Sequence, residues 1–90
     1  MDRFLIESPH SAGDCQKVVK DVYAEGYLSH CDWGCEVGVH TAWVVIEAEN
    51  DQQALRVVPY ALRKNARAIK LVKFNEETFK KWEANAPAAP

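Results

Sequence analysis

The chain has 90 residues, of which 48% are hydrophobic, and its eleven basic and thirteen acidic side chains give a formal net charge of −2. A chain of this length forms one domain with a modest core, burying about 60–65% of the surface that it exposes when unfolded. The balanced charge, without a Lys/Arg cluster on any element, argues against a nucleic-acid partner. No stretch approaches the roughly 20 apolar residues of a membrane span. An odd number of cysteines at irregular spacing favours a reducing, cytoplasmic compartment over a disulfide framework.

Apolar residues that recur at helical spacing predict two main helices. The first begins after Ser11, which resembles an N-terminal cap, and ends at Gly26, a residue suited to the left-handed position after a helix. Its buried face is predicted to comprise Cys15, Val18, Val19 and Val22. The second helix begins at Asn50, and Pro59 must kink or restart it because proline removes a hydrogen bond. A short third helix is predicted to open at Asn75.

Four strands are predicted, at residues 3–7, 27–35, 41–49 and 68–74. Together with the helices they contain two half-copies, in which Leu5-Ile6-Glu7 and Val45-Ile46-Glu47 each precede a helix. Such a duplicated split β-α-β unit predicts an α+β fold, the ferredoxin-like βαββαβ plait, which has a four-stranded antiparallel sheet with two helices on one face. The predicted short helix at the C-terminus follows this plait. We expect the first and third strands to lie side by side and parallel at the centre of the sheet; a two-layer α+β domain with another strand order is the alternative. Residues 1–83 are predicted to form this single domain, and residues 84–90 a flexible Ala/Pro tail.

Alternation along the strands divides their side chains between two faces. Phe4 and Ile6 suit the helix-covered face, as do Ala42, Val44 and Ile46. If the turn between the second and third strands centres on Gly38-Val39, His30 and Asp32 belong to the opposite, open face. The other residues predicted for the open face are Leu5, Glu7, Trp43, Val45, Glu47 and Lys70.

This open face is too apolar to be left in water and too polar for a dry core. It therefore predicts a homodimer that forms through the open sheet face, with a cleft that would hold a small-molecule ligand. In the simpler interpretation, Trp43 and its neighbours only pack at the dimer interface and bind no ligand, because aromatic residues are common at interfaces.

Glu7 and Glu47 occupy equivalent places in the two half-copies, so on adjacent parallel strands they would stand close together. Two carboxylates at close range share a proton or bind a cation. The alternative is that each carboxylate pairs with a lysine such as Lys70 or Lys73.

The array His30-Cys31-x3-Cys35-x4-His40 contains the ligand types of a zinc site. On an extended strand, however, Cys31 and Cys35 would lie about 13 Å apart, too far for one tetrahedral ion. Cys35 and His40, facing each other across the turn, are the pair that could share a divalent metal ion, with His10 as a further candidate ligand. Buried structural cysteines are the alternative.

Two further kinds of chemistry are compatible with these residues. His10 lies beside the start of a helix and could carry a proton, or it could cap the loop. Cys35 with His40 could form a thiolate–imidazole pair, although the sequence assigns no third orienting residue. The candidate ligand-binding residues are thus His10, His30, Trp33, Trp43, Glu7 and Glu47, and the candidate metal ligands are Cys35 and His40.

Several short motifs between positions 3 and 74 together resemble one family. The family comprises small bacterial proteins of uncharacterised role within the ferredoxin-like, dimeric α/β-barrel superfamily. The motifs are Glu7-Ser8-Pro9-His10, Trp33-Gly34-Cys35, Gly38 with His40-Thr41 and Trp43, Glu47-Ala48, and Ala54-Leu55 with Val58-Pro59. The resembling family carries a glycine after the His-Thr pair, where this chain has Ala42. The resemblance implies the fold and a homodimer, and it implies no particular reaction.

The wider superfamily includes cofactor-independent monooxygenases, haem-degrading enzymes and small binding or sensor proteins, so two functions remain open. The first is a non-catalytic homodimer that binds a small molecule or metal ion in a cleft walled by Trp43, His40 and Glu47. The second is a small monooxygenase-like or isomerase-like enzyme. In that enzyme His10 or His30 would move a proton, and Trp33 or Trp43 would hold an apolar substrate.

Overall fold

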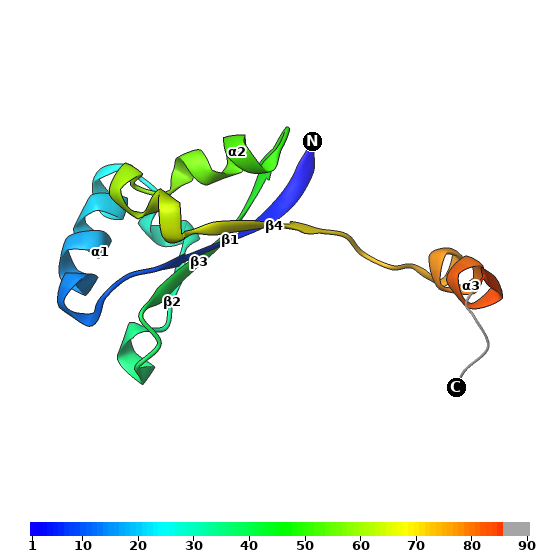
Figure 1. Ribbon diagram of the computed structural model, residues 1–90, viewed down its shortest axis with the longest axis horizontal. Coiled ribbons are helices and arrows are strands. Elements are labelled where there is room, and N and C mark those ends of the chain that lie inside the picture. The colour runs from blue at the N-terminus through cyan, green and yellow to red at the C-terminus, as the bar shows by residue number, and fades with distance from the viewer. Residues whose placement is uncertain (86–90) are drawn as a thin grey trace.

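Alternating apolar and polar residues form two long central strands, β1 (Asp2–Pro9) and β3 (Thr41–Ala48), in the computed structural model, which describes residues 1–85. The edge strands β2 (Asp32–Trp33) and β4 (Arg67–Leu71) complete a four-stranded antiparallel sheet in the order β2-β3-β1-β4. The helices α1 (Cys15–Ala24) and α2 (Asp51–Ala54) lie on one side of this sheet (Figure 1). The predicted α+β class and the antiparallel sheet are confirmed.

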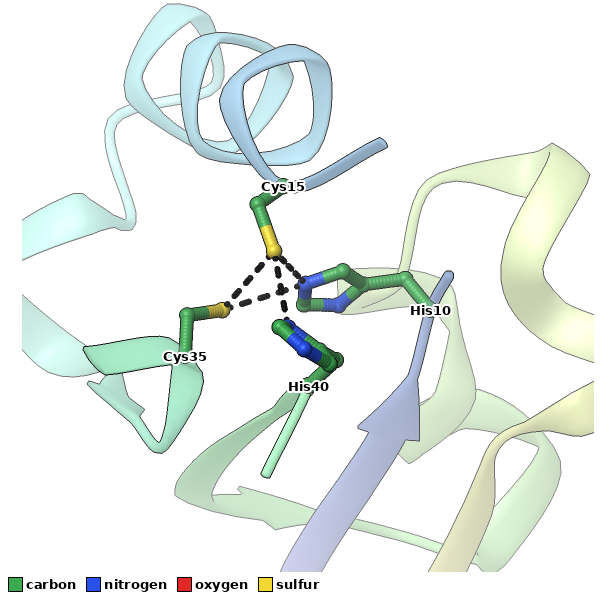
Figure 2. Close-up of side chains that lie close together, drawn as sticks. All are labelled: His10, Cys15, Cys35 and His40. Atoms are coloured by element: carbon green, nitrogen blue, oxygen red, sulfur yellow. Dashed lines mark hydrogen bonds between the residues drawn. The ribbon is translucent and has the colours of Figure 1, made fainter. Parts of the chain in front are cut away.

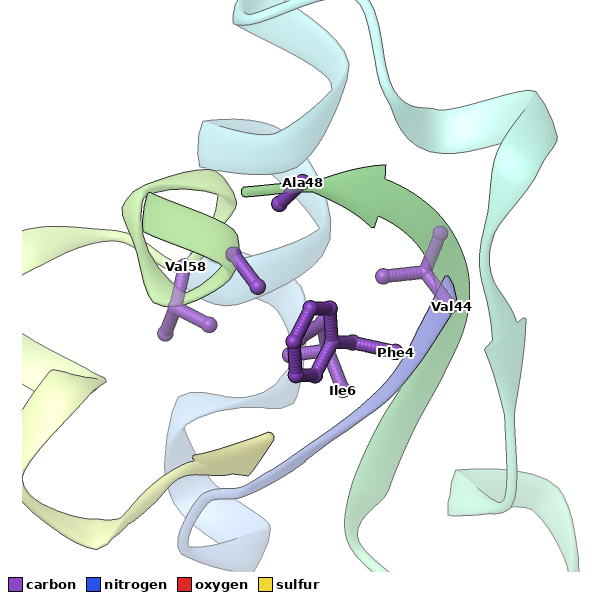
Figure 3. Close-up of a cluster of buried hydrophobic side chains, with 6 residues drawn as sticks. Phe4, Ile6, Val44, Ala48 and Val58 are labelled. Carbon is purple, nitrogen blue, oxygen red and sulfur yellow. The ribbon is translucent and has the colours of Figure 1, made fainter. Parts of the chain in front are cut away.

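The hydrophobic core lies between the helices and the inner face of the central strands. Its buried cluster consists of Phe4, Ile6, Val44, Ala48, Ala54 and Val58 (Figure 3). Ile6 is 1% exposed, and burying such a side chain stabilises the fold by about 1.5–3 kcal/mol. The inner face predicted by strand alternation is therefore confirmed for β1 and β3.

The central strands β1 and β3 are antiparallel, so the prediction that they are parallel was wrong. Phe4 pairs with Ile46, and Glu7 pairs with Trp43. The physical reason lies in the connections. The chain returns through α1 before β2, so β2 runs in the same direction as β1, and the turn from β2 into β3 reverses that direction.

The predicted second strand at 27–35 is largely replaced by turns. Its sheet part is the two residues of β2, flanked by 3₁₀ turns at Leu28–His30 and Cys35–Val37. Asp32 pairs with Trp43, so Asp32 belongs to the open face as predicted, whereas His30 lies outside the sheet. The register differs from the prediction because the turn is longer than a two-residue hairpin and ends at Gly38, which has a left-handed φ of 84°.

Two capping signals are confirmed, at the end of α1 and at the start of α2. The predicted cap of the first helix was wrong, because the Ser11 side chain makes no capping hydrogen bond and a 3₁₀ turn at Ala12–Asp14 separates it from α1. Gly26 follows α1 with φ 82°, and the Asn50 side chain accepts a hydrogen bond from the Gln53 amide at 2.8 Å. α2 is short because the chain passes through a 3₁₀ turn at Leu55–Val57 and then meets Pro59. A further 3₁₀ segment, Tyr60–Asn65, restarts after the proline, as predicted.

Lys70 was predicted to lie on the open face, and this prediction was wrong. It pairs with Phe4 in the β1–β4 register, and residues directly opposite each other project to the same side of a sheet. Its ammonium group lies 3.6 Å from an Asp2 carboxylate oxygen instead. The strand β4 also ends at Leu71, three residues earlier than predicted.

The helix α3 (Glu76–Asn85) stands away from the sheet at the end of an extended segment that follows β4 (Figure 1). Phe74 and Trp82 stack with ring centroids 5.9 Å apart, and both side chains are largely exposed. The predicted tail began at residue 84, but α3 includes residues 84 and 85, and residues 86–90 lie outside the described part. Within residues 1–85 no helix has the length and apolar character needed to cross a membrane.

Candidate metal centre

Four metal-ligating side chains meet at one end of the sheet (Figure 2). His10 follows the last residue of β1, and His40 precedes the first residue of β3, so the pairing of these strands brings the two histidines together. The His10 amide donates a hydrogen bond to the His40 carbonyl oxygen at 2.9 Å. Cys15 is the first residue of α1, and Cys35 is the first residue of the 3₁₀ turn Cys35–Val37. We refer to His10, Cys15, Cys35 and His40 as the Cys2His2 cluster.

The distances within the Cys2His2 cluster are close to those of a tetrahedral metal site. All four potential ligand atoms lie within 4.8 Å of one another. The Cys15 Sγ atom is 3.1 Å from His10 Nε2, 3.3 Å from Cys35 Sγ and 3.1 Å from His40 Nδ1. Zn–S and Zn–N bonds of normal length give ligand–ligand distances of about 3.4–3.8 Å in a tetrahedron. An outward shift of the ligand atoms by about 0.5 Å or less would accommodate Zn²⁺.

The surroundings favour the uncharged forms of two side chains in the unmetallated cluster, His10 and Cys15. Burial, together with the nearby His40, lowers the pKa of His10, which favours the neutral imidazole that binds metals. The hydrogen bond with Cys35, followed by burial, raises the pKa of the Cys15 thiol. A cation in the cluster would reverse this effect by stabilising the thiolate, so metal binding would release protons.

The sequence predicted three members of the Cys2His2 cluster and missed the fourth. Cys35 and His40 were the predicted pair, His10 was the further candidate, and the structure brings all three together. Cys15 was missed because its spacing matched the buried face of α1. A signal for it exists in the sequence, because His10-x4-Cys15 mirrors Cys35-x4-His40.

Cys31 lies outside the Cys2His2 cluster and packs against the hydrophobic core. Burial raises the pKa of its thiol. The chain between Cys31 and Cys35 is not a continuous strand, since β2 ends at Trp33 and a 3₁₀ turn follows. The prediction that Cys31 and Cys35 do not share one metal ion therefore agrees with the structure. The reason given for it, a continuous extended strand between them, was wrong.

Glu7 and Glu47 do not meet, so the predicted pair of carboxylates was wrong. Glu7 lies opposite Trp43, and Glu47 lies opposite Arg3, four positions or about 13 Å further along β3. The Glu7 carboxylate accepts hydrogen bonds from Arg67 Nε at 3.1 Å and Trp43 Nε1 at 3.3 Å. These two hydrogen bonds, that of Arg67 foremost, lower the pKa of Glu7. Its cationic partner is therefore an arginine and not Lys70 or Lys73.

The remaining ligand-binding candidates are dispersed. The Trp33 ring packs edge-on against the His10 ring at 6.1 Å, so it flanks the Cys2His2 cluster. His30 contacts the Tyr27 ring at 6.0 Å and is exposed. Trp43 lies on the open face of the sheet, bound to Glu7. The structure thus brings together one of the predicted groups, the metal ligands, and separates the others.

An open groove of about 670 Å³ runs beside the Cys2His2 cluster. Cys15 and Cys35 line it, together with Cys31, Trp33 and Lys20. Both cysteines of the cluster therefore border a groove that is open to solvent, and each is half-buried.

Comparisons of the chain with models of protein families, with curated proteins and with solved structures find no match. The resemblance to the dimeric α/β-barrel superfamily therefore stays a prediction, and the geometry of the Cys2His2 cluster carries the functional argument.

Proposed function

We propose that the protein binds a divalent transition-metal ion, Zn²⁺ in the first instance, through the Cys2His2 cluster. The single observation that carries the proposal is the approach of four ligand atoms, two sulfur and two nitrogen, to within 4.8 Å of one another. Two thiolates and two imidazoles are a common ligand set of four-coordinate zinc. Softer thiophilic ions such as Cu⁺ are the main competitors for such a set.

The proposed role of the metal is structural and non-catalytic. Four protein ligands fill a tetrahedral ion, which leaves no position for a substrate or an activated water. The segment between α1 and β3 has just the two residues of β2 in the sheet, so it is weakly anchored by strand pairing. A metal held by Cys35 and His40 would tie this segment to the ends of β1 and α1. This favours the non-catalytic function over the monooxygenase-like or isomerase-like alternative.

The proposed architecture is the ferredoxin-like plait, assembled as a homodimer through the open face of the sheet. The strand order β2-β3-β1-β4, with helices between β1 and β2 and between β3 and β4, supports the plait. The dimer is supported by the uncovered apolar side chains of that face, among which Val45 is 51% exposed and lies opposite Leu5. Three free cysteines suit the reducing cytoplasm, the proposed location.

The metal site is tested with Cys15→Ser and its matched control Cys31→Ser. Reduced, metal-free protein is titrated with Zn²⁺ against a chromophoric chelator, and Co²⁺ is used to report thiolate coordination by its visible absorption. We expect one metal ion per chain in the wild type and in Cys31→Ser. Since changes in the outer shell of a metal site already cost about 10–100-fold in affinity, loss of a ligand in Cys15→Ser should cost at least about 100-fold. Equal affinities for the two variants, or no stoichiometric binding to the wild type, would disprove the site.

A further inference from the structure

We propose that Cys15 and Cys35 are a site of reversible oxidation and form an intramolecular disulfide with mild oxidants such as hydrogen peroxide. The two Sγ atoms lie 3.3 Å apart, with the Cys15 thiol donating to the Cys35 sulfur. A disulfide bond has a length of about 2.05 Å, so the sulfur atoms must approach by about 1.3 Å. Each cysteine is the first residue of a helical segment, where small side-chain rotations can supply this movement.

Access and selectivity both follow from the groove beside the cluster. Cys15 and Cys35 line this open groove, so a small oxidant reaches them without unfolding the protein. Cys31 lines the same groove, but it packs against the hydrophobic core. Within residues 1–85, no hydrogen bond joins Cys31 to the sulfur of Cys15 or Cys35, and Cys31 is not part of the Cys2His2 cluster. The geometry therefore selects one of the three pairings that three cysteines allow.

The oxidation balances with hydrogen peroxide as the named oxidant. One sulfur attacks a peroxide oxygen, the O–O bond breaks, and a sulfenic acid and one water form. The second sulfur attacks the sulfenic sulfur, the S–S bond forms, and the hydroxyl leaves as a second water after taking up a proton. Two electrons pass from the two sulfurs to the peroxide, and the products are one disulfide and two waters.

The disulfide excludes the metal. Thiolates are the strong zinc ligands of the cluster, and a disulfide leaves His10 and His40 as the remaining pair. Oxidation should therefore release the ion. This second step rests on the proposed metal-binding function, whereas formation of the disulfide in metal-free protein does not.

The first experiment maps the disulfide in the metal-free full chain. Reduced protein is treated with hydrogen peroxide, free thiols are alkylated, and the protein is digested with trypsin and an endoproteinase that cleaves before aspartate. Tryptic cleavage after Lys17 and cleavage before Asp32 place Cys15, Cys31 and Cys35 on three different peptides. We expect peptides 14–17 and 32–50 to be crosslinked and Cys31 to be alkylated. Cys31→Ser should give the same crosslink, and Cys35→Ser should abolish it.

A crosslink that contains Cys31, or oxidation to sulfinic acid without any intramolecular crosslink, would overturn the proposal. The second experiment adds peroxide to zinc-loaded protein in the presence of a chromophoric zinc indicator. One equivalent of zinc should appear for each Cys15–Cys35 disulfide, and a thiol reductant followed by zinc should restore the loaded protein. If the crosslink forms but zinc never binds, the metal-binding function fails and the disulfide stands; if zinc binds and no crosslink forms, the disulfide proposal fails alone.

Discussion

At Gly34 the backbone passes so close to its neighbours that a side chain has no room. A Cβ atom there would lie 2.6 Å from the Val39 carbonyl oxygen and 3.1 Å from the Trp43 ring. The Gly34 carbonyl also accepts the Val39 amide at 2.9 Å, which closes the turn. This turn fixes the separation of Cys35 and His40, so Gly34 positions half of the Cys2His2 cluster without being a ligand.

Gly34→Ala should therefore weaken both the fold and the metal site. The clash with backbone atoms should lower the free energy of unfolding by about 1–3 kcal/mol, the usual cost of overpacking, and zinc affinity should fall with it. Urea denaturation of metal-free protein and zinc competition measure the two effects. Gly13→Ala is the matched control, because a Cβ at Gly13 has nothing within 4 Å and its φ is not left-handed. Equal stability of the two variants would contradict the steric argument.

Glu7 provides a prediction about pH. Its pKa is lowered by the hydrogen bonds from Arg67 and Trp43, so the carboxylate stabilises the folded state above the pKa that it has in the unfolded chain. That stability is lost as the pH falls through the lower, folded-state pKa. In metal-free protein, Glu7→Gln should be less stable than the wild type at pH 7, and the difference should shrink progressively below the ordinary glutamate pKa of about 4.3. Glu83→Gln, on the exposed α3, is the control, and urea denaturation at neutral and acid pH measures both. A difference that does not change with pH would contradict the assignment.

The residues of the Cys2His2 cluster differ in how far they could be predicted. Cys35 and His40 are related by a turn, which short spacing reveals, and His10 follows a strand that ends at Ser8-Pro9. Cys15 depends on tertiary structure, because the packing of Val18 and Val22 on the sheet decides where the first turn of α1 lies. The helical stripe that buries those two valines continues to Cys15, whose side chain lies in the Cys2His2 cluster and not in the core.

At the scale of elements, β1 and β3 were predictable because eight-residue strands display a clear alternation between faces. β2 was overestimated, since aromatic and apolar residues around Trp33 have strand propensity whereas Gly34 and the 3₁₀ turns end the strand early. The direction of the central pair depends on the connections between elements. Local patterns do not contain that information, and the mistaken parallel pairing led directly to the mistaken carboxylate pair.

The placement of α3 predicts that the sheet domain does not need it. Removal of residues 76–90 should leave the unfolding midpoint and the zinc affinity unchanged, because α3 stands away from the sheet and from the Cys2His2 cluster. Thermal unfolding and zinc competition on the truncated chain measure this. A loss of stability would show that α3 belongs to the folded domain in solution, as the predicted boundary at residue 83 implies. A truncation that removes residues 67–90, and with them β4, should by contrast prevent folding, because β4 pairs with β1 along its length.

At the scale of the whole molecule, the open face of the sheet is the surface proposed to join two copies. Val45→Glu should convert the dimer into a monomer, because it introduces a charge between Leu5 on the neighbouring strand and the apposed copy. Sedimentation velocity over a range of concentrations measures the change. Val37→Glu is the control, since Val37 is 82% exposed on the 3₁₀ turn at Cys35–Val37. A monomeric wild type, or a Val45→Glu variant that dimerises as well as Val37→Glu, would disprove this interface.

The mirrored spacing of the four candidate ligands has a consequence for the order of folding. His10 and Cys15 are five positions apart, as are Cys35 and His40, so each pair can contact an ion while the chain is still unfolded. An ion held by both pairs closes the 20-residue loop between the two cysteines. Part of the entropy that the strands would otherwise lose on pairing is then already lost. If the cluster binds zinc as proposed, metal capture and the docking of β3 against β1 are alternative first steps of one folding reaction, and the concentration of free zinc determines which of them comes first.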